Sequence, residues 1–256
     1  MVPPSLGGII AAARFGRDAT PITSSLTWRV YADRPDQNGI FRVIKEEKAA
    51  SPTFTLPPGS YILHVAFGLA TAAKKVQVRA DTAREVVDIA AGGVRFEGRV
   101  SDTRIAATQI SFDVFKGSQF DGGEKKPLVA DVKSGEIVLL PEGTYHVLSN
   151  YGDGNATMRY DFRVQIAKLT DTRINHRAAM ITLKLVNERG GEALANTAWS
   201  VLTPGGDVIK ESFDVFPNVV LAEGDYVAIA RYEGKVFNRE FKVEPGVDRE
   251  IELLAR

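Results

Sequence analysis

The chain has 256 residues, 44% of them hydrophobic, and its 32 Lys and Arg residues balance its 32 Asp and Glu residues. A chain of this length can bury one large core or several small ones, and its zero net charge provides no long-range field toward nucleic acid or an anionic membrane. The absence of cysteine excludes disulfides, thiolate zinc sites and a cysteine nucleophile.

The first apolar stretch, residues 7–13 (GGIIAAA), is far shorter than a bilayer span and lacks the basic start and cleavage pattern of a signal peptide. We therefore expect a first strand here and no transmembrane segment. The start of the sequence is compatible both with a native start and with an export signal that has been removed.

Three later segments carry the same order of features. They are FTLPPGSYILHV at residues 54–65, IVLLPEGTYHVL at 137–148 and VVLAEGDYVAIA at 219–230. Their glycines, Gly59, Gly143 and Gly224, lie 84 and 81 residues apart. A fixed period of this kind indicates a repeat architecture. In the first corner we expect Pro57 or Pro58 to fix φ and Gly59 to supply a positive φ.

Each of these segments follows a stretch in which apolar and polar residues alternate around one aromatic residue. The aromatic residues are Trp28, Phe112 and Trp199, and the period of two is that of a half-buried strand. We expect all three to lie in cores. Further alternating strands are predicted at residues 74–78, 160–164 and 239–243.

The pattern predicts an all-β fold of three tandem Greek-key β-sandwich modules with little helix. The predicted boundaries are residues 1–91, 92–178 and 179–256. Because each small sandwich is filled by its own side chains, we expect no enclosed active site.

The segments LPPGSY, LPEGTY and LAEGDY, each leading into a core strand, resemble the corner of prealbumin-like sandwiches. This group includes the carboxypeptidase regulatory-like, Cna-B and PEGA-type repeats. The three copies also resemble uncharacterised bacterial envelope proteins. The resemblance implies an extracytoplasmic location in bacteria, in the periplasm or at the cell surface, and roles as stalks, spacers, adhesin segments or binding platforms. The third copy departs from the pattern, with Ala222 in place of Pro57 and Pro141.

The sharpest local anomaly is SNYGDGNATMRY at residues 149–160. Asp153, Asn155 and Asp161 bring oxygen ligands close together in sequence, and Tyr151 offers an aromatic face for stacking. These four residues are the candidate ligand site, for a cation or a sugar. The alternative is a plain hairpin tip, because Gly, Asp and Asn are the residues that tight turns use.

No other motif predicts catalysis, a metal or a cofactor. His64, His146 and His176 are the only histidines, and none pairs with another at a ligand spacing. His64 and His146 fall at nearly the same place in their repeats, which suggests the strand surface. No P-loop, GxSxG or dinucleotide-binding motif is present in context.

The sequence favours a non-enzymatic cell-envelope structural or protein-interaction module with a protein partner in the envelope. The alternative is a carbohydrate- or peptidoglycan-binding protein that uses loops of the second repeat and the exposed aromatics Tyr31, Tyr151 and Tyr232. An enzyme is the third hypothesis. The sequence does not define the oligomeric state.

Overall fold

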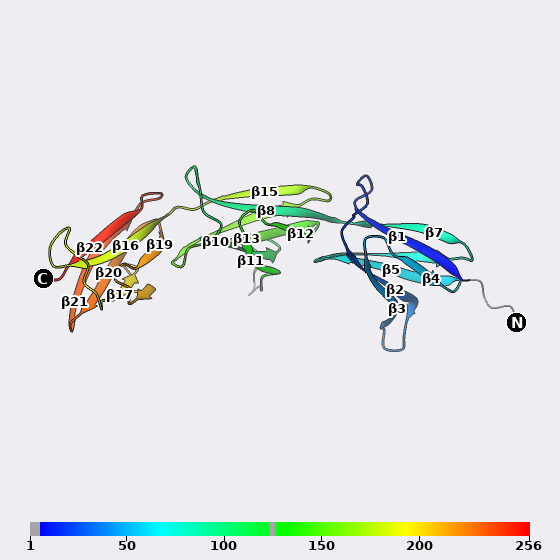
Figure 1. Ribbon diagram of the computed structural model, residues 1–256, viewed down its shortest axis with the longest axis horizontal. Coiled ribbons are helices and arrows are strands. Elements are labelled where there is room, and N and C mark those ends of the chain that lie inside the picture. The colour runs from blue at the N-terminus through cyan, green and yellow to red at the C-terminus, as the bar shows by residue number, and fades with distance from the viewer. Residues whose placement is uncertain (1–5, 123–125) are drawn as a thin grey trace. The chain divides into compact units, whose positions relative to one another are not determined.

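The computed structural model describes residues 6–122 and 126–256 (Figure 1). Every regular element in these residues is a β-strand. They contain no helix with the length and apolar character needed to cross a membrane. The all-β prediction is confirmed.

Residues 7–89 form two sheets, with the strand orders β4-β1-β7 and β3-β2-β5-β6. In the first sheet β1 pairs antiparallel with β4 and parallel with β7. The strands are β1 (Gly7–Phe15), β2 (Leu26–Pro35), β3 (Phe41–Ala49), β4 (Thr53–Leu56), β5 (Gly59–Phe67), β6 (Ala70–Val78) and β7 (Thr82–Ile89).

Residues 178–254 repeat this topology, with the orders β19-β16-β22 and β18-β17-β20-β21. Again the first strand pairs antiparallel with one neighbour and parallel with the last strand. The strands are β16 (Ala178–Val186), β17 (Ala198–Leu202), β18 (Val208–Ser212), β19 (Asn218–Ala222), β20 (Gly224–Tyr232), β21 (Lys235–Val243) and β22 (Arg249–Leu254).

The intervening residues give the orders β12-β8-β15, with the short β9 on β8, and β11-β10-β13-β14. The same order therefore occurs three times, and the predicted three sandwiches are confirmed. The strands are β8 (Ala91–Val100), β9 (Thr103–Arg104), β10 (Ile110–Lys116), β11 (Val129–Lys133), β12 (Ile137–Pro141), β13 (Gly143–Tyr151), β14 (Ala156–Val164) and β15 (Leu169–Asn175).

The chain divides into two compact units, and the division runs through the second repeat. The first unit is residues 1–95, 137–144 and 163–170, and the second is residues 96–136, 145–162 and 171–256. The boundaries 1–91, 92–178 and 179–256 stay a prediction.

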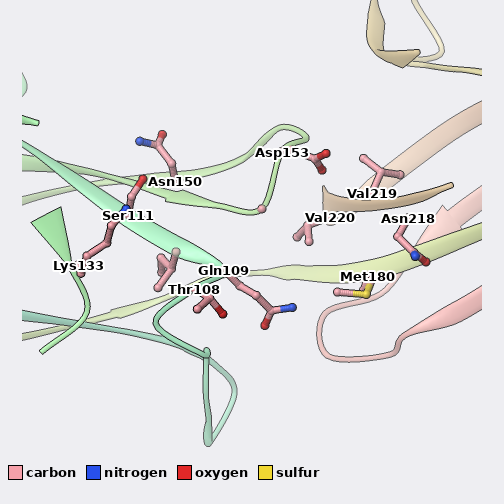
Figure 2. A pocket seen from close by; sticks show the side chains of 12 residues that line it. Thr108, Gln109, Ser111, Lys133, Asn150, Asp153, Met180, Asn218, Val219 and Val220 are labelled. Carbon is pink, nitrogen blue, oxygen red and sulfur yellow. The ribbon is translucent and has the colours of Figure 1, made fainter. Parts of the chain in front are cut away.

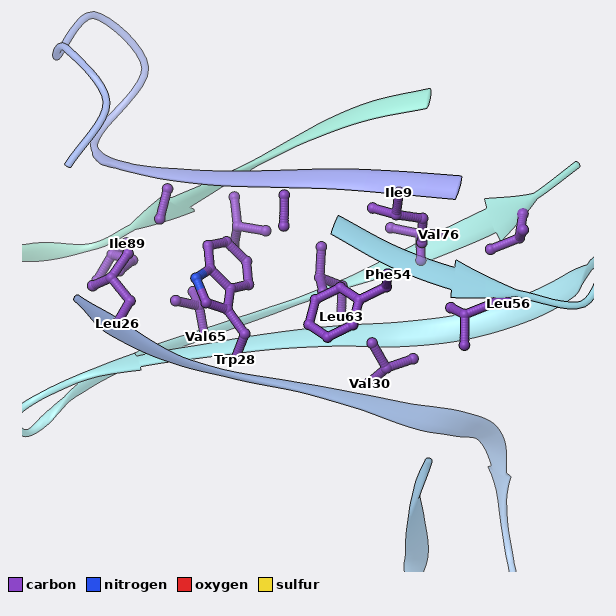
Figure 3. Packing of buried hydrophobic residues seen from close by; sticks show 14 of the residues in the cluster. Ile9, Leu26, Trp28, Val30, Phe54, Leu56, Leu63, Val65, Val76 and Ile89 are labelled. Carbon is purple, nitrogen blue, oxygen red and sulfur yellow. The ribbon is translucent and has the colours of Figure 1, made fainter. Parts of the chain in front are cut away.

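The core of the first repeat forms around Trp28 (Figure 3). The inward residues of β2 are Leu26, Trp28 and Val30, as their alternation in the sequence predicts. The Trp28 indole Nε1–H donates a hydrogen bond to the Ala49 carbonyl oxygen at 3.1 Å. The ring is therefore fully buried without leaving its polar atom unpaired.

The second unit contains two further cores. In the third repeat Trp199 is buried in a cluster with Leu183 and Leu221. In the second repeat the Phe96 ring lies 5.2 Å from Phe112 and 5.3 Å from Phe162, measured between ring centroids. Such contacts add to the free energy gained from burial alone. The core assignments of Trp28, Phe112 and Trp199 are confirmed.

The corner tyrosines of the first and third repeats occupy matching places. The hydroxyl of Tyr61 donates to the carbonyl oxygen of Pro57, and that of Tyr226 donates to the carbonyl oxygen of Ala222, both at 2.9 Å. The expected positive φ at Gly59 is wrong, because Gly59 is not among the residues with positive φ. This glycine begins β5 and lies beside the tyrosine ring, where a Cβ would be 3.6 Å from the nearest ring carbon.

Candidate functional site

The predicted ligand loop is the tip of the β13–β14 hairpin. In the first and third repeats, the corresponding nine-residue strands are joined by two residues, 68–69 and 233–234. In the second repeat four residues, 152–155, join them. The anomaly in the sequence is therefore an extension of the tip by two residues.

This extended tip is pressed against β19 of the third repeat. A Cβ on Gly152 would lie 2.5 Å from Cγ2 of Val220, and a Cβ on Gly154 would lie 2.0 Å from the Val220 carbonyl oxygen. Both distances are shorter than any real Cβ contact, so these positions require glycine. Gly152 also has φ of +68°, a conformation that side chains disfavour. The two glycines allow the tip to approach the strand backbone.

Asn155 joins the tip to the corner of the third repeat. Its Oδ1 accepts a hydrogen bond from the Ala222 backbone N–H at 3.0 Å, and its Nδ2 donates to the Tyr226 hydroxyl at 2.9 Å. With the bond from the Tyr226 hydroxyl to the Ala222 carbonyl oxygen, these contacts form a closed ring. A backbone N–H can only donate, so the bond from Ala222 fixes which way the Asn155 amide points.

The linker between the second and third repeats consists of His176 and Arg177 and is itself tied down. The His176 backbone N–H donates to the Arg99 carbonyl oxygen at 2.7 Å, and the Glu223 backbone N–H donates to the Arg177 carbonyl oxygen at 2.7 Å. The side chains of Arg177 and Glu223 form an ion pair at 2.5 Å. The linker backbone thus bonds to both repeats.

The His176 ring is buried beneath the junction, with 2% of the residue exposed. Its Nε2 lies 2.7 Å from the Ser149 hydroxyl, and its ring centroid lies 5.6 Å from that of Tyr151 in an edge-on arrangement. Burial lowers the pKa of His176 to about 4, against a smaller opposing effect of the Ala156 backbone. The imidazole is therefore neutral near pH 7.

The four predicted site residues do not converge on one point. Tyr151 packs on His176, Asn155 binds the third repeat, and Asp153 forms an ion pair with Lys210 at 2.5 Å. Asp161 lies six residues farther along β14, about 20 Å at the usual rise of a strand.

Asp161 binds the β10–β11 loop. Its carboxylate accepts hydrogen bonds from the Ser118 hydroxyl and, at 2.9 Å, from the Gln119 backbone N–H. The bond from Ser118 is the main reason that the pKa of Asp161 lies below its ordinary value. A ligand for the predicted site stays a prediction. The residues that the structure describes contain no cluster of three His, Asp or Glu side chains placed to hold a metal.

A hollow of about 420 Å³ lies beside the tip (Figure 2). Gln109, Lys133 and Asn150 line it from the second repeat, and Met180 and Asn218 line it from the third. Its described lining has no aromatic ring, which is the group that sugar stacking needs. The walls of the hollow present amide, hydroxyl, ammonium, carboxylate and aliphatic groups.

His146 corrects one expectation. The sequence suggested the strand surface, but only 3% of this residue is exposed. Its ring stacks on Phe115 with centroids 4.9 Å apart, and its Nδ1 lies 2.9 Å from the Gly117 carbonyl oxygen. Phe115 on β10 and Gly117 just after this strand therefore cover the histidine.

The sequence did not reveal the residues of the third repeat that meet the tip, which are Val220, Ala222 and Tyr226. Two signals pointed to them. The tip of the second repeat is two residues longer than the other tips, and the third corner has lost its proline. These two departures mark the tip and the corner that the structure brings together.

Residues 180–255 match a family described as the Rhizobiales growth-associated tandem repeat domain. No curated protein matches the sequence. This family match covers the third repeat.

Among solved structures, the TIE protein of Bacillus anthracis matches with 14% identity and a TM-score of 0.30, over 98% of this chain and half of that protein. A streptococcal ancillary pilin matches with 11% identity and a TM-score of 0.32, over 98% of this chain and 99% of the pilin. A minor pilin of Streptococcus agalactiae matches with 14% identity and a TM-score of 0.34, over 66% of this chain and 95% of the pilin. At these TM-scores the likenesses support no inference about function.

Proposed function

We propose that the chain is a non-enzymatic structural module of the bacterial envelope, in the periplasm or at the cell surface, whose tandem sandwiches form a stiff spacer. The observation that carries the proposal is the junction of the second and third repeats. There Asn155 bonds to the backbone and corner tyrosine of the next repeat, and the linker backbone bonds to both sides. A junction built in this way resists bending because bending breaks several hydrogen bonds at once.

Two further observations support the proposal. The three predicted core aromatics are buried in the interiors of their sandwiches, which is the arrangement of a scaffold. The matched family is described as a growth-associated tandem repeat domain, which fits a repeat-built bacterial protein. Residues 1–91, 92–178 and 179–256 are proposed as its three modules.

Protein partners are the proposed ligands of the exposed loops. Phe120, on the β10–β11 loop, is 87% exposed, and Phe213, after β18, is 82% exposed. Exposed aromatic side chains are common anchors in protein interfaces. The tyrosines suggested for sugar stacking, Tyr31, Tyr151 and Tyr232, are each half-buried, so no observation favours a glycan.

Limited trypsin digestion of the full chain tests the stiffness. The bond after Arg177 lies in the linker, and the bond after Arg189 lies in an exposed turn of the third repeat, so the second serves as the internal reference. We expect cleavage after Arg189 long before cleavage after Arg177, with fragments identified by mass spectrometry. Equal rates at the two bonds would mean that the linker is open and the spacer flexible.

Cell fractionation tests the location. In a bacterium that produces the protein, we expect an antibody to detect it in the periplasmic or surface fraction. Recovery in the cytosolic fraction alone, alongside a cytosolic marker, would contradict the envelope assignment.

A further inference from the structure

We infer that the extended tip of the second repeat and the proline-free corner of the third repeat are a matched recognition pair, with Asn155 and Ala222 as its specificity determinants. This inference rests on the proposed function and deepens it. The surface of the third repeat around Val220 and Ala222 binds a β-hairpin tip of the form Gly-x-Gly-Asn, which the preceding repeat supplies.

The backbone N–H of Ala222 points away from the neighbouring strand β16. In the β16–β19 ladder, the Glu223 N–H bonds to the Arg177 carbonyl oxygen, and the Leu183 N–H bonds to the Pro217 carbonyl oxygen. Hydrogen-bonded pairs alternate along an antiparallel ladder, so the intervening Ala222 directs its N–H to the free edge. There its partner is Asn155.

The first and second repeats have a proline at this corner position. Pro141 pairs with Ala91 as Ala222 pairs with Ala178, and Pro57 follows β4 at the same place. Proline has no N–H to donate. An asparagine at the preceding tip would therefore find no backbone donor at Pro141.

The tip of the first repeat is followed in the sequence by a corner that has a proline, Pro141. It has only two residues, Gly68 and Leu69, and carries no asparagine. A Cβ on Gly68 would meet no heavy atom within 4 Å, whereas Cβ atoms on Gly152 and Gly154 would overlap Val220. The close approach of the tip to Val220 and the tip asparagine thus occur together. They occur at the corner of the third repeat, where Ala222 has a backbone N–H in place of a proline.

These observations assign a separate role to each departure from the repeat pattern. The two extra tip residues bring Asn155 to the next repeat, and the alanine supplies the donor that Asn155 recognises. The third repeat is accordingly specific for an asparagine-tipped neighbour, and the pair fixes which repeat precedes it.

The test compares Ala222→Pro with Ala222→Ser in the full chain. Proline is compatible with the corner, since Pro57 and Pro141 occupy it, but it removes the donor, whereas serine keeps the N–H. Tryptic cleavage after Arg177 is the readout, because cleavage tracks the open population when reclosing is fast. We expect cleavage roughly fivefold to tenfold faster in Ala222→Pro, as the loss of a net hydrogen bond predicts, and an unchanged rate in Ala222→Ser.

A double-mutant cycle with Asn155→Ala tests the pairing itself. If the two residues act through one contact, Asn155→Ala combined with Ala222→Pro should accelerate cleavage no more than either change alone. The Trp199 signal in fluorine NMR of the 5-fluorotryptophan-labelled chain in urea checks that the third repeat stays folded. If Ala222→Pro unfolds the third repeat, two other variants carry the test. One is Asn155→Ala alone, and the other is Asn155→Gln combined with Ala222→Ser. We expect faster cleavage after Arg177 only in Asn155→Ala, because only this variant loses the side-chain acceptor oxygen.

The outcomes separate the two proposals. Rapid cleavage after Arg177 in the unmodified chain would refute the stiff spacer. Slow cleavage in the unmodified chain with equal rates in Ala222→Pro and Ala222→Ser, or with additive effects in the cycle, would overturn the recognition pair and leave the spacer standing.

Discussion

Acidification should weaken the second unit through His176. The pKa of this residue is about 4 in the folded chain, against 6.5 for an ordinary histidine. Below pH 6.5 the unfolded chain therefore binds a proton that the folded chain does not, and the free energy of unfolding falls as the pH falls. The full loss, complete below pH 4, is about 3 kcal/mol at 1.36 kcal/mol per pKa unit.

The window between pH 6.5 and pH 5 isolates the histidine. By pH 5 the loss attributable to His176 is about 2 kcal/mol. The carboxylates with lowered pKa values in this unit, Glu97, Asp161 and Glu223, have ordinary values of 4.5 or below, so their contributions are lost mainly at lower pH. Most of the early loss therefore comes from the imidazole.

The assay is urea unfolding followed by fluorine NMR of 5-fluorotryptophan. The chain has two tryptophans, so the Trp28 signal reports the first repeat and the Trp199 signal reports the third. His176→Gln should remove the pH dependence of the Trp199 transition. The matched control is His64→Gln, because burial lowers the pKa of His64 in the first repeat, and it should affect only the Trp28 transition. The reasoning would be refuted if the unfolding free energy from the Trp199 transition stayed constant between pH 6.5 and 5. It would also be refuted if the pH dependence of this free energy persisted in His176→Gln.

Three further changes have defined outcomes. Truncating the buried ring in Trp199→Ala should lower the unfolding free energy of the third repeat by about 3–5 kcal/mol in urea denaturation, and an unchanged midpoint would contradict its place in the core. Gly92→Ala should cost about 1–3 kcal/mol in the first unit, because the new Cβ would lie 2.1 Å from the Gln165 carbonyl oxygen. Calorimetry that shows no drop in melting temperature would refute that overlap. Asp153→Asn should cost at most about 1 kcal/mol, since its ion pair with Lys210 is solvent-exposed, and a larger loss in urea would show that this pair, with the asparagine bridge, sustains the junction.

The sandwiches were predictable because their signals are local. Alternation around Trp28, Phe112 and Trp199 specifies one buried face per strand, and the recurring corner places the next strand. The positive φ expected at Gly59 was wrong because a Pro-Gly pair in sequence does not reveal that the glycine already belongs to the following strand.

The junction was not predictable by the same means. Asn155 and Ala222 are 67 residues apart, and the direction of the Ala222 N–H depends on the ladder register. Gly, Asp and Asn at a hairpin tip have the same composition whether the tip is solvated or docked. His176 in sequence is a polar linker residue, and its burial comes with contacts to Ser149 and Tyr151, which lie more than twenty residues earlier in the chain. Asp161 was grouped with the tip because it is near the tip in the sequence. Since β14 is extended, residues that are near in sequence lie far apart along it.

The most direct measurement of the docked junction is a spin-label distance across it. Because the chain has no cysteine, Arg159→Cys and Glu240→Cys provide two unique labelling sites, both exposed and both in the second unit. The control variant replaces residues 152–155 with Glu-Gly, the two-residue tip of the third repeat. The docked junction predicts one narrow distance distribution in the full-length tip and a broad one in the shortened tip. A broad distribution in both, or an equally narrow one in both, would contradict the claim that the extended tip locks the third repeat onto the second.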